Sequence, residues 1–233
     1  AFSAGIAKVK YNLLTKADIA VHYAKEQKIK ISTYKEDGNI EQKYKQNIAM
    51  ATAIREALND KRIICHYQPI LDQRTGKIYK YETLVRMLSK EGRIIPPIEF
   101  LEISKKTKLY PYITREVLHQ ACNTFKNREE NFSINLSIDD IKDINIVNEI
   151  IETIIETNTA SRITFEILES EEIENYQEVR NFSKRIKEIG SKIAVDDFGT
   201  GYSNFEHILK LNVDYIKIDG SLIKGMENNK KNK

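Results

Sequence analysis

Residues 192–205 read KIAVDDFGTGYSNF, a short apolar run followed by two adjacent aspartates and a Gly-x-Gly loop. The β-branched residues of the run favour a buried strand, and the residues after the loop favour a new helix. In α/β barrels the chemistry lies at this carboxyl end of a strand. Asp196 and Asp197 repel each other and lose hydration on burial, so the pair indicates a bound cation.

The composition favours a globular α/β protein. The chain has 233 residues, of which 41% are hydrophobic, enough for one large domain and a smaller unit. The 37 basic and 34 acidic residues nearly balance, and no basic stripe interleaved with aromatic residues points to a nucleic acid polymer as partner. Cys65 and Cys122 have no CxxC partners, which favours a reducing, cytoplasmic compartment. No apolar run reaches the roughly 20 residues of a spanning helix, so we expect no membrane contact from this segment.

The first 60 residues differ in pattern from the rest. Residues 1–35 predict a strand near 1–7, a helix over 13–25 and a strand near 30–34, too little to bury a core alone. We interpret them as the end of another domain. Residues 36–60 follow as a polar linker at 36–41, with a Gly-Asn turn signal, and a connecting helix over 42–60.

Residues 61–233 predict alternating strands and helices. A short turn at 72–76 joins strands at 63–71 and 77–86, which must pair antiparallel. Helices over 98–107 and 114–126 follow, and then strands at 132–137, 162–168, 192–196 and 213–218 with helical stretches between them. Such crossovers give parallel strands. We therefore expect an α/β fold of the TIM-like (β/α) barrel type with one antiparallel strand. A doubly wound open sheet is the alternative, because one sequence does not reveal closure.

Polar side chains interrupt four of these apolar strands near their carboxyl ends. They are Glu82, Asn135, Glu166 and Asp196. An ionised group there costs several kcal/mol unless it is paired or bound to a metal. All four offer hard oxygen donors, which selects Mg²⁺ or Mn²⁺ over zinc. Asp197 could reach a second ion, in the paired arrangement that activates water on phosphate esters.

Two basic residues accompany these carboxylates. Arg86 lies on the same strand face as Glu82, where its guanidinium could hold a phosphate. The alternative is a simple Glu82–Arg86 ion pair, worth little to stability. Lys217, flanked by apolar residues, could orient the attacking water and neutralise charge on phosphoryl oxygens. Its alternative is a structural pair with Asp219.

Six ordered motifs carry a resemblance to a known family. They are YQPI at 67–70, ETLVR at 82–86, NLS at 135–137, EILES at 166–170, DDFGTGYS at 196–203 and KID at 217–219. From about Ala51 to Gly220 the chain resembles the EAL domain. The resemblance implies a TIM-like barrel with one antiparallel strand that hydrolyses cyclic di-GMP to pGpG with Mg²⁺ or Mn²⁺.

The resemblance also implies roles for individual residues. Glu82, Asn135, Glu166 and Asp196 would bind the first metal, Asp197 the second, and Lys217 a metal-linked water; Arg86 and Gln68 would contact cyclic di-GMP; Glu169 would anchor the loop 197–205, which in the family lies near the dimer interface. We therefore expect a homodimer through this loop.

The chain also departs from the family pattern. Residues 1–35 resemble the C-terminal end of a GGDEF (diguanylate cyclase) domain, but the motif that names that family is absent, so we expect no cyclase activity. Thr83 replaces the Ala of the signature triplet and should point away from Glu82. The family continues through two more strand–helix units with a general-base Glu, so this piece by itself is expected to be an incomplete, inactive barrel. For the parent protein the expected function is the phosphodiesterase. The alternative is a catalytically inactive cyclic di-GMP sensor or a dimerising regulatory domain.

Overall fold

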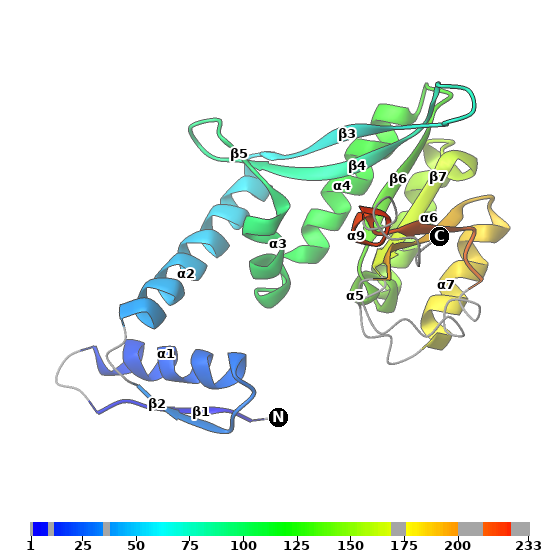
Figure 1. Ribbon diagram of the computed structural model, residues 1–233. Helices are drawn as coiled ribbons and strands as arrows, with labels where there is room; N and C mark the ends of the chain where they lie inside the picture. Colours follow the sequence, from blue (N-terminus) through cyan, green and yellow to red (C-terminus); the bar gives the residue numbers. More distant parts are fainter. Residues whose placement is uncertain (1, 9–11, 35–37, 169–175, 200–211, 225–233) are drawn as a thin grey trace.

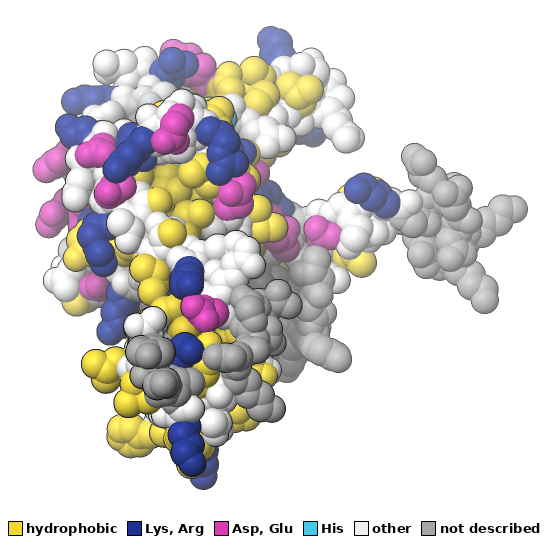
Figure 2. Space-filling view, turned by 90° about the vertical axis from the view of Figure 1, so that its left-hand side faces the viewer, with side chains coloured by type: hydrophobic (Ala, Val, Ile, Leu, Met, Phe, Trp, Pro, Cys, Tyr) yellow, Lys and Arg dark blue, Asp and Glu magenta, His cyan; other side chains and the backbone are white. Residues whose placement is uncertain are grey.

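The computed structural model describes residues 2–8, 12–34, 38–168, 176–199 and 212–224 (Figure 1). Within these ranges the chain forms a small N-terminal unit, a long helix and a larger α/β unit. Figure 1 shows the long helix, α2, running from the small unit to the larger one. On the face shown in Figure 2, basic and acidic side chains are interspersed, as expected from 37 basic and 34 acidic residues. No helix among the described residues is long and apolar enough to cross a membrane.

The N-terminal unit is a strand–helix–strand element, as predicted. Strands β1 (Ala4–Ile6) and β2 (Ile31–Thr33) pair in parallel, and α1 (Leu13–Glu26) connects them. Ala20 and Ala24 of α1 are buried. Gly5 allows the close approach of strand and helix, because a Cβ there would collide with the backbone of Ala17 and Val21.

The connecting helix begins earlier than predicted. Helix α2 spans Gly38–Asn59, so residues 38–41 of the predicted linker belong to the helix. Glu41 lies in its first turn, where the helix dipole favours a negative charge. The Glu41 carboxylate accepts a 3.0 Å hydrogen bond from the Tyr34 hydroxyl and pairs with Lys45 at 2.8 Å. These contacts outweigh the turn preference of the Gly-Asn pair.

The larger unit is built on one mostly parallel sheet. Its seven described strands are β3 (Ile63–Leu71), β4 (Ile78–Leu88), β5 (Ile94–Ile95), β6 (Asn131–Leu136), β7 (Ile163–Leu168), β8 (Lys192–Phe198) and β9 (Tyr215–Ile218). Their order is β3-β4-β6-β7-β8-β9, with β5 paired to β4. The β3–β4 hairpin is antiparallel, as predicted, and β4, β6, β7, β8 and β9 pair in parallel. The two-residue antiparallel strand β5 was not predicted, because it is too short to show a pattern.

Helices cover the outer face of this sheet. They are α3 (Pro97–Lys106), α4 (Tyr110–Phe125), α5 (Ile138–Lys142), α6 (Ile144–Glu156) and α7 (Tyr176–Glu188), with α9 (Gly220–Lys224) after the last described strand. Phe125 of α4 stacks on Phe132 of β6 with centroids 4.4 Å apart. Thr83 is buried, and strand alternation directs it to the face opposite Glu82, as predicted.

The sheet curves strongly. In the strand order β4 and β9 are four steps apart, which in a flat sheet is about 19 Å. Yet the hydroxyl groups of Tyr79 on β4 and Tyr215 on β9 lie 2.8 Å apart. The inner face is therefore concave, with Glu82, Glu166 and Asp196 on it.

Candidate metal centre

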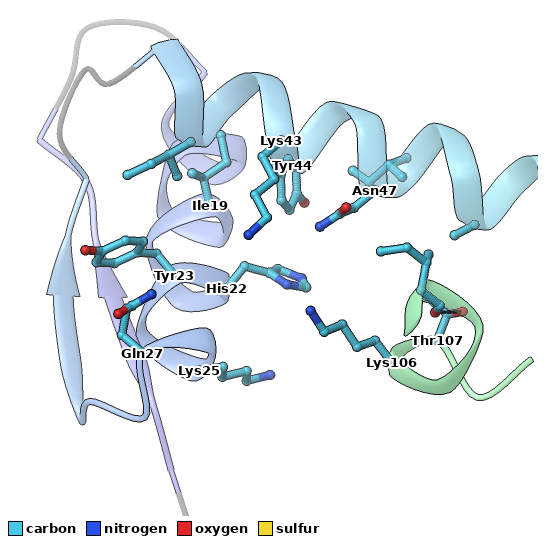
Figure 3. A pocket seen from close by; sticks show the side chains of 14 residues that line it. Ile19, His22, Tyr23, Lys25, Gln27, Lys43, Tyr44, Asn47, Lys106 and Thr107 are labelled. Carbon is cyan, nitrogen blue, oxygen red and sulfur yellow. Dashed lines mark hydrogen bonds between the residues drawn. The ribbon is translucent and has the colours of Figure 1, made fainter. Parts of the chain in front are cut away.

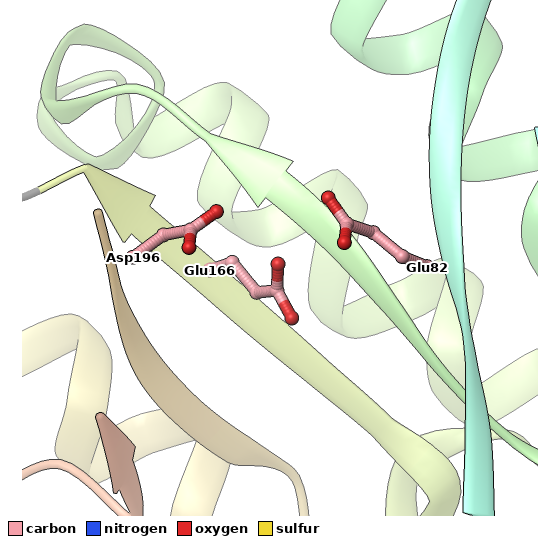
Figure 4. Close-up of side chains that lie close together, drawn as sticks. All are labelled: Glu82, Glu166 and Asp196. Atoms are coloured by element: carbon pink, nitrogen blue, oxygen red, sulfur yellow. The ribbon is translucent and has the colours of Figure 1, made fainter. Parts of the chain in front are cut away.

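Three carboxylates from three strands meet on the concave face. Glu82 of β4, Glu166 of β7 and Asp196 of β8 each offer an oxygen, and these oxygens lie within 4.8 Å of one another. Figure 4 shows the three side chains directed toward a common point. The side chain of Glu166 is fully buried, whereas Asp196 and Glu82 are 15% and 19% exposed. We call these three residues the carboxylate cluster.

One ammonium group touches the whole cluster. Lys217 Nζ lies 2.6 Å from Glu166 Oε2, 2.8 Å from Asp196 Oδ2 and 3.3 Å from Glu82 Oε2. Burial would lower the pKa of Lys217, but the three carboxylates outweigh burial and raise it above its usual value. Lys217 therefore pairs with the cluster and not with Asp219, which accepts a hydrogen bond from Ser221 N.

A second lysine, which sequence reasoning missed, completes the partners of Glu166. Lys80 Nζ lies 2.9 Å from Glu166 Oε1, and its side chain is 8% exposed. Burial opposes the ionisation of Glu166, but Lys80 and Lys217 outweigh it and hold the pKa of Glu166 below its usual value. The signal was available, because Lys80 is two residues from Glu82 and so faces the same side of the strand.

The arrangement fits a divalent metal ion. One cationic atom already lies within 3.3 Å of all three carboxylates, so a single centre can contact them together. The donors are carboxylate oxygens, the ligands that Mg²⁺ and Mn²⁺ prefer. Asn135 of β6 is the register partner of Glu166, and partners on neighbouring parallel strands face the same side. The predicted fourth ligand therefore lies on the face of the cluster.

A β-bulge separates the two adjacent aspartates. Val195 pairs with Ile216 and Phe198 with Ile218, so Asp196 and Asp197 together oppose the single residue Lys217. Asp197 adopts a left-handed φ of 56° and lies outside the cluster. Burial, and then the charges of Asp196 and Asp219, raise the pKa of Asp197. The bulge thus gives the two carboxylates different positions, as a second-ion site would require.

The predicted substrate residues lie on β3 and β4. Gln68 is the register partner of Glu82, so both side chains share the inner face. Arg86 donates to the carbonyl oxygen of Val85 at 2.8 Å, and Glu82 pairs with Lys217 instead of Arg86. Glu169 and residues 200–205 of the predicted dimer loop lie outside the described residues.

A separate cavity lies at the junction of the N-terminal unit and the barrel. Its volume is about 670 Å³, and it is lined by α1, α2 and α3 (Figure 3). Lys25, Lys43, Lys106 and His22 line it together with apolar residues. It includes no residue of the carboxylate cluster, so the two features are distinct.

Comparisons with known proteins agree with this geometry. The model of the EAL domain matches residues 51–233. The chain is 30% identical over 227 residues to the cyclic di-GMP phosphodiesterase PdeB of Shewanella oneidensis, covering 94% of this chain and 26% of PdeB. It is 25% identical over 226 residues to the bifunctional diguanylate cyclase/cyclic di-GMP phosphodiesterase MucR of Pseudomonas aeruginosa, covering 94% of this chain and 33% of MucR.

The fold also matches solved structures. A structure described as the PaMucR phosphodiesterase in complex with c-di-GMP superposes with a TM-score of 0.71 at 25% identity, covering 79% of this chain and 77% of that one. EAL structures are TIM-like barrels, so the predicted fold class is confirmed. The chain spans about a quarter of the length of the curated relatives it matches first, at 27%, 26% and 28%. Because the family model covers most of its length, the chain belongs to the EAL domain family.

Proposed function

We propose that this chain is the EAL portion of a phosphodiesterase that hydrolyses cyclic di-GMP to pGpG with Mg²⁺ or Mn²⁺. The observation that carries the proposal is the contact of one cationic atom, Lys217 Nζ, with the carboxylates of Glu82, Glu166 and Asp196. The similarity to PdeB and to a phosphodiesterase bound to c-di-GMP supports this substrate.

Each site residue then has a chemical task. Glu82, Asn135, Glu166 and Asp196 would hold the first ion, and Asp197 the second. Bound divalent ions supply a water of lowered pKa and offset charge on the phosphoryl oxygens.

The remaining polar residues act on substrate and water. Lys217, whose ammonium stays protonated at neutral pH, would move toward that water and orient it by donating a hydrogen bond. The guanidinium of Arg86 and the amide of Gln68 would contact the phosphate ester from β4 and β3.

The organisation of the chain follows the same proposal. We assign residues 1–35 to the C-terminal end of a GGDEF domain, residues 36–60 to a linker and connecting helix, and residues 61–233 to the EAL barrel. The parallel β1–α1–β2 element supports the first assignment, as does the match of MucR to 94% of the chain. A cytoplasmic location and a homodimer through the loop 197–205 belong to this proposal.

Turnover by the intact protein tests the function. The protein that contains this chain should convert cyclic di-GMP to pGpG with Mn²⁺ and lose this activity in EDTA, as measured by chromatography of the nucleotides. A folded sample that produces no pGpG with either Mg²⁺ or Mn²⁺ would refute the enzyme. If such a sample still bound cyclic di-GMP tightly in EDTA, the function would be that of a sensor.

A further inference from the structure

Lys80 contacts Glu166, the one fully buried carboxylate of the cluster. It precedes Glu82 by two residues, toward the amino-terminal end of β4, and its Nζ contacts Glu166 Oε1 at 2.9 Å. Glu166 Oε2 contacts Lys217 instead. Each oxygen of Glu166 therefore has its own lysine. In the strand register Lys80 is level with Asn131, before the Asn135–Glu166 pair, whereas Lys217 lies opposite Asp196 and Asp197, after it.

The two lysines differ in their freedom to move. Lys217 is 26% exposed and contacts three carboxylates, whereas Lys80 is 8% exposed and contacts Glu166 alone among them. A divalent cation held by the cluster has to take over the contacts of Lys217. Lys80 contacts the other oxygen, Oε1, so an ion that replaces Lys217 at Oε2 does not have to displace Lys80.

Burying the ammonium group of Lys80 costs free energy that its ion pair with Glu166 does not clearly recover. Buried ion pairs contribute little net stability compared with well-packed apolar side chains, because both charges lose their hydration. Lys192, another inward-facing lysine near the amino-terminal ends of the strands, donates to the Tyr215 hydroxyl at 3.0 Å. It leaves the carboxylates untouched, so a lysine in this part of the barrel does not have to join the cluster.

The positive charge of Lys80 weakens the attraction of the cluster for a metal ion. Glu82, Glu166 and Asp196 bring three negative charges, and Lys80 returns one positive charge that stays after Lys217 has moved. Like charges in a buried site repel strongly. The hydrogen bond from Lys80 also uses one lone pair of Oε1, which makes binding of the ion through both oxygens of Glu166 less favourable.

We propose that Lys80 is a positioning residue that fixes the Glu166 carboxylate and limits the affinity of the cluster for divalent cations. This inference rests on the metal-dependent function proposed above. Its consequence is that the cluster binds a metal ion weakly when no nucleotide is present. A bound nucleotide should raise the affinity for the metal ion, because the negative charge of its phosphates offsets the positive charge of Lys80.

Mn²⁺ titration of the intact protein, with free Mn²⁺ followed by electron paramagnetic resonance in the absence of nucleotide, tests the proposal. Lys80→Met and Lys80→Gln remove the charge and should tighten Mn²⁺ binding by about tenfold or more. Lys80→Arg keeps the charge and should bind like the wild type, as should the matched control Lys192→Met. Adding a non-hydrolysed analogue of cyclic di-GMP should reduce the difference in Mn²⁺ affinity between the wild type and Lys80→Met.

The outcomes separate this inference from the proposed function. If Lys80→Gln and Lys80→Met, checked for folding by circular dichroism, bind Mn²⁺ no more tightly than wild type, the role of Lys80 is refuted while the metal site stands. If only one of these two neutral variants folds, its Mn²⁺ affinity alone tests the role of Lys80. If the wild type and every variant fail to bind Mn²⁺, the metal-dependent function fails, and the inference with it.

Discussion

Replacing Lys217 by Met should expose the mutual repulsion of the carboxylate cluster. The change removes an ammonium group within 3.3 Å of three carboxylates, of which Glu166 is fully buried. Removing one partner of a buried ion pair costs about 3–5 kcal/mol, and the partial exposure of Lys217 argues for the lower end, about 3 kcal/mol. For a domain of this size that corresponds to a fall in Tm of roughly 6–12 °C in EDTA.

Thermal unfolding of the intact protein, followed by circular dichroism with and without Mn²⁺, measures this effect. Mn²⁺ should raise the Tm of Lys217→Met more than that of wild type, because an ion replaces the missing charge. The matched control is Lys187→Met, which removes a partly exposed ion pair with Asp214 at 3.1 Å and should cost at most about 1 kcal/mol. A loss of Tm in Lys217→Met that is equal in EDTA and in Mn²⁺ would contradict the reasoning.

Three further predictions follow from the same geometry. Glu82→Gln and Asp196→Asn should each weaken Mn²⁺ binding at least about tenfold and abolish pGpG formation. The control Glu149→Gln, which breaks an ion pair with Arg115 outside the cluster, should change neither property. Equal Mn²⁺ affinity in all three variants would exclude the cluster as the metal site. The low pKa of Glu166 stabilises the fold above its unfolded pKa of about 4.3, and this contribution is lost as the pH falls through the folded pKa. The Tm advantage of wild type over Glu166→Gln in EDTA should therefore shrink from pH 6 to pH 3, and an advantage that grows would refute this. Thr83→Val replaces a buried hydroxyl that has no hydrogen-bond partner in the described chain, so urea denaturation should show an increase of up to about 1 kcal/mol in the free energy of unfolding. A decrease of more than about 1 kcal/mol would contradict the placement of this hydroxyl without a partner.

Much of the fold follows from local patterns in the sequence. The β3–β4 hairpin was predictable because its turn is too short for any but an antiparallel return, and β6, β7 and β8 because their apolar runs alternate with amphipathic helices. The inward polar residues followed from the same alternation, since Glu82, Glu166 and Asp196 each interrupt an apolar strand.

Features that depend on distant contacts were not predictable. The curvature that brings Tyr79 to Tyr215 arises from the packing of the whole sheet. The separation of Asp197 from the cluster depends on a bulge and a positive φ that no local pattern encodes. The spacing of Lys80 to Glu82 gave its face of the strand, but its contact with Glu166, 86 residues away, arises only when the sheet curves.

The continuity of α2 has a mechanical consequence. Its 22 residues make an uninterrupted rod of about 33 Å, and Ile54 and Ala57 near its far end are fully buried against the barrel. At its near end, Tyr44 is hydrogen-bonded to Asp18 of α1. A rotation of α2 about its own axis would therefore reach the packing of Ile54 and Ala57 against the barrel through one continuous helix over residues 38–59.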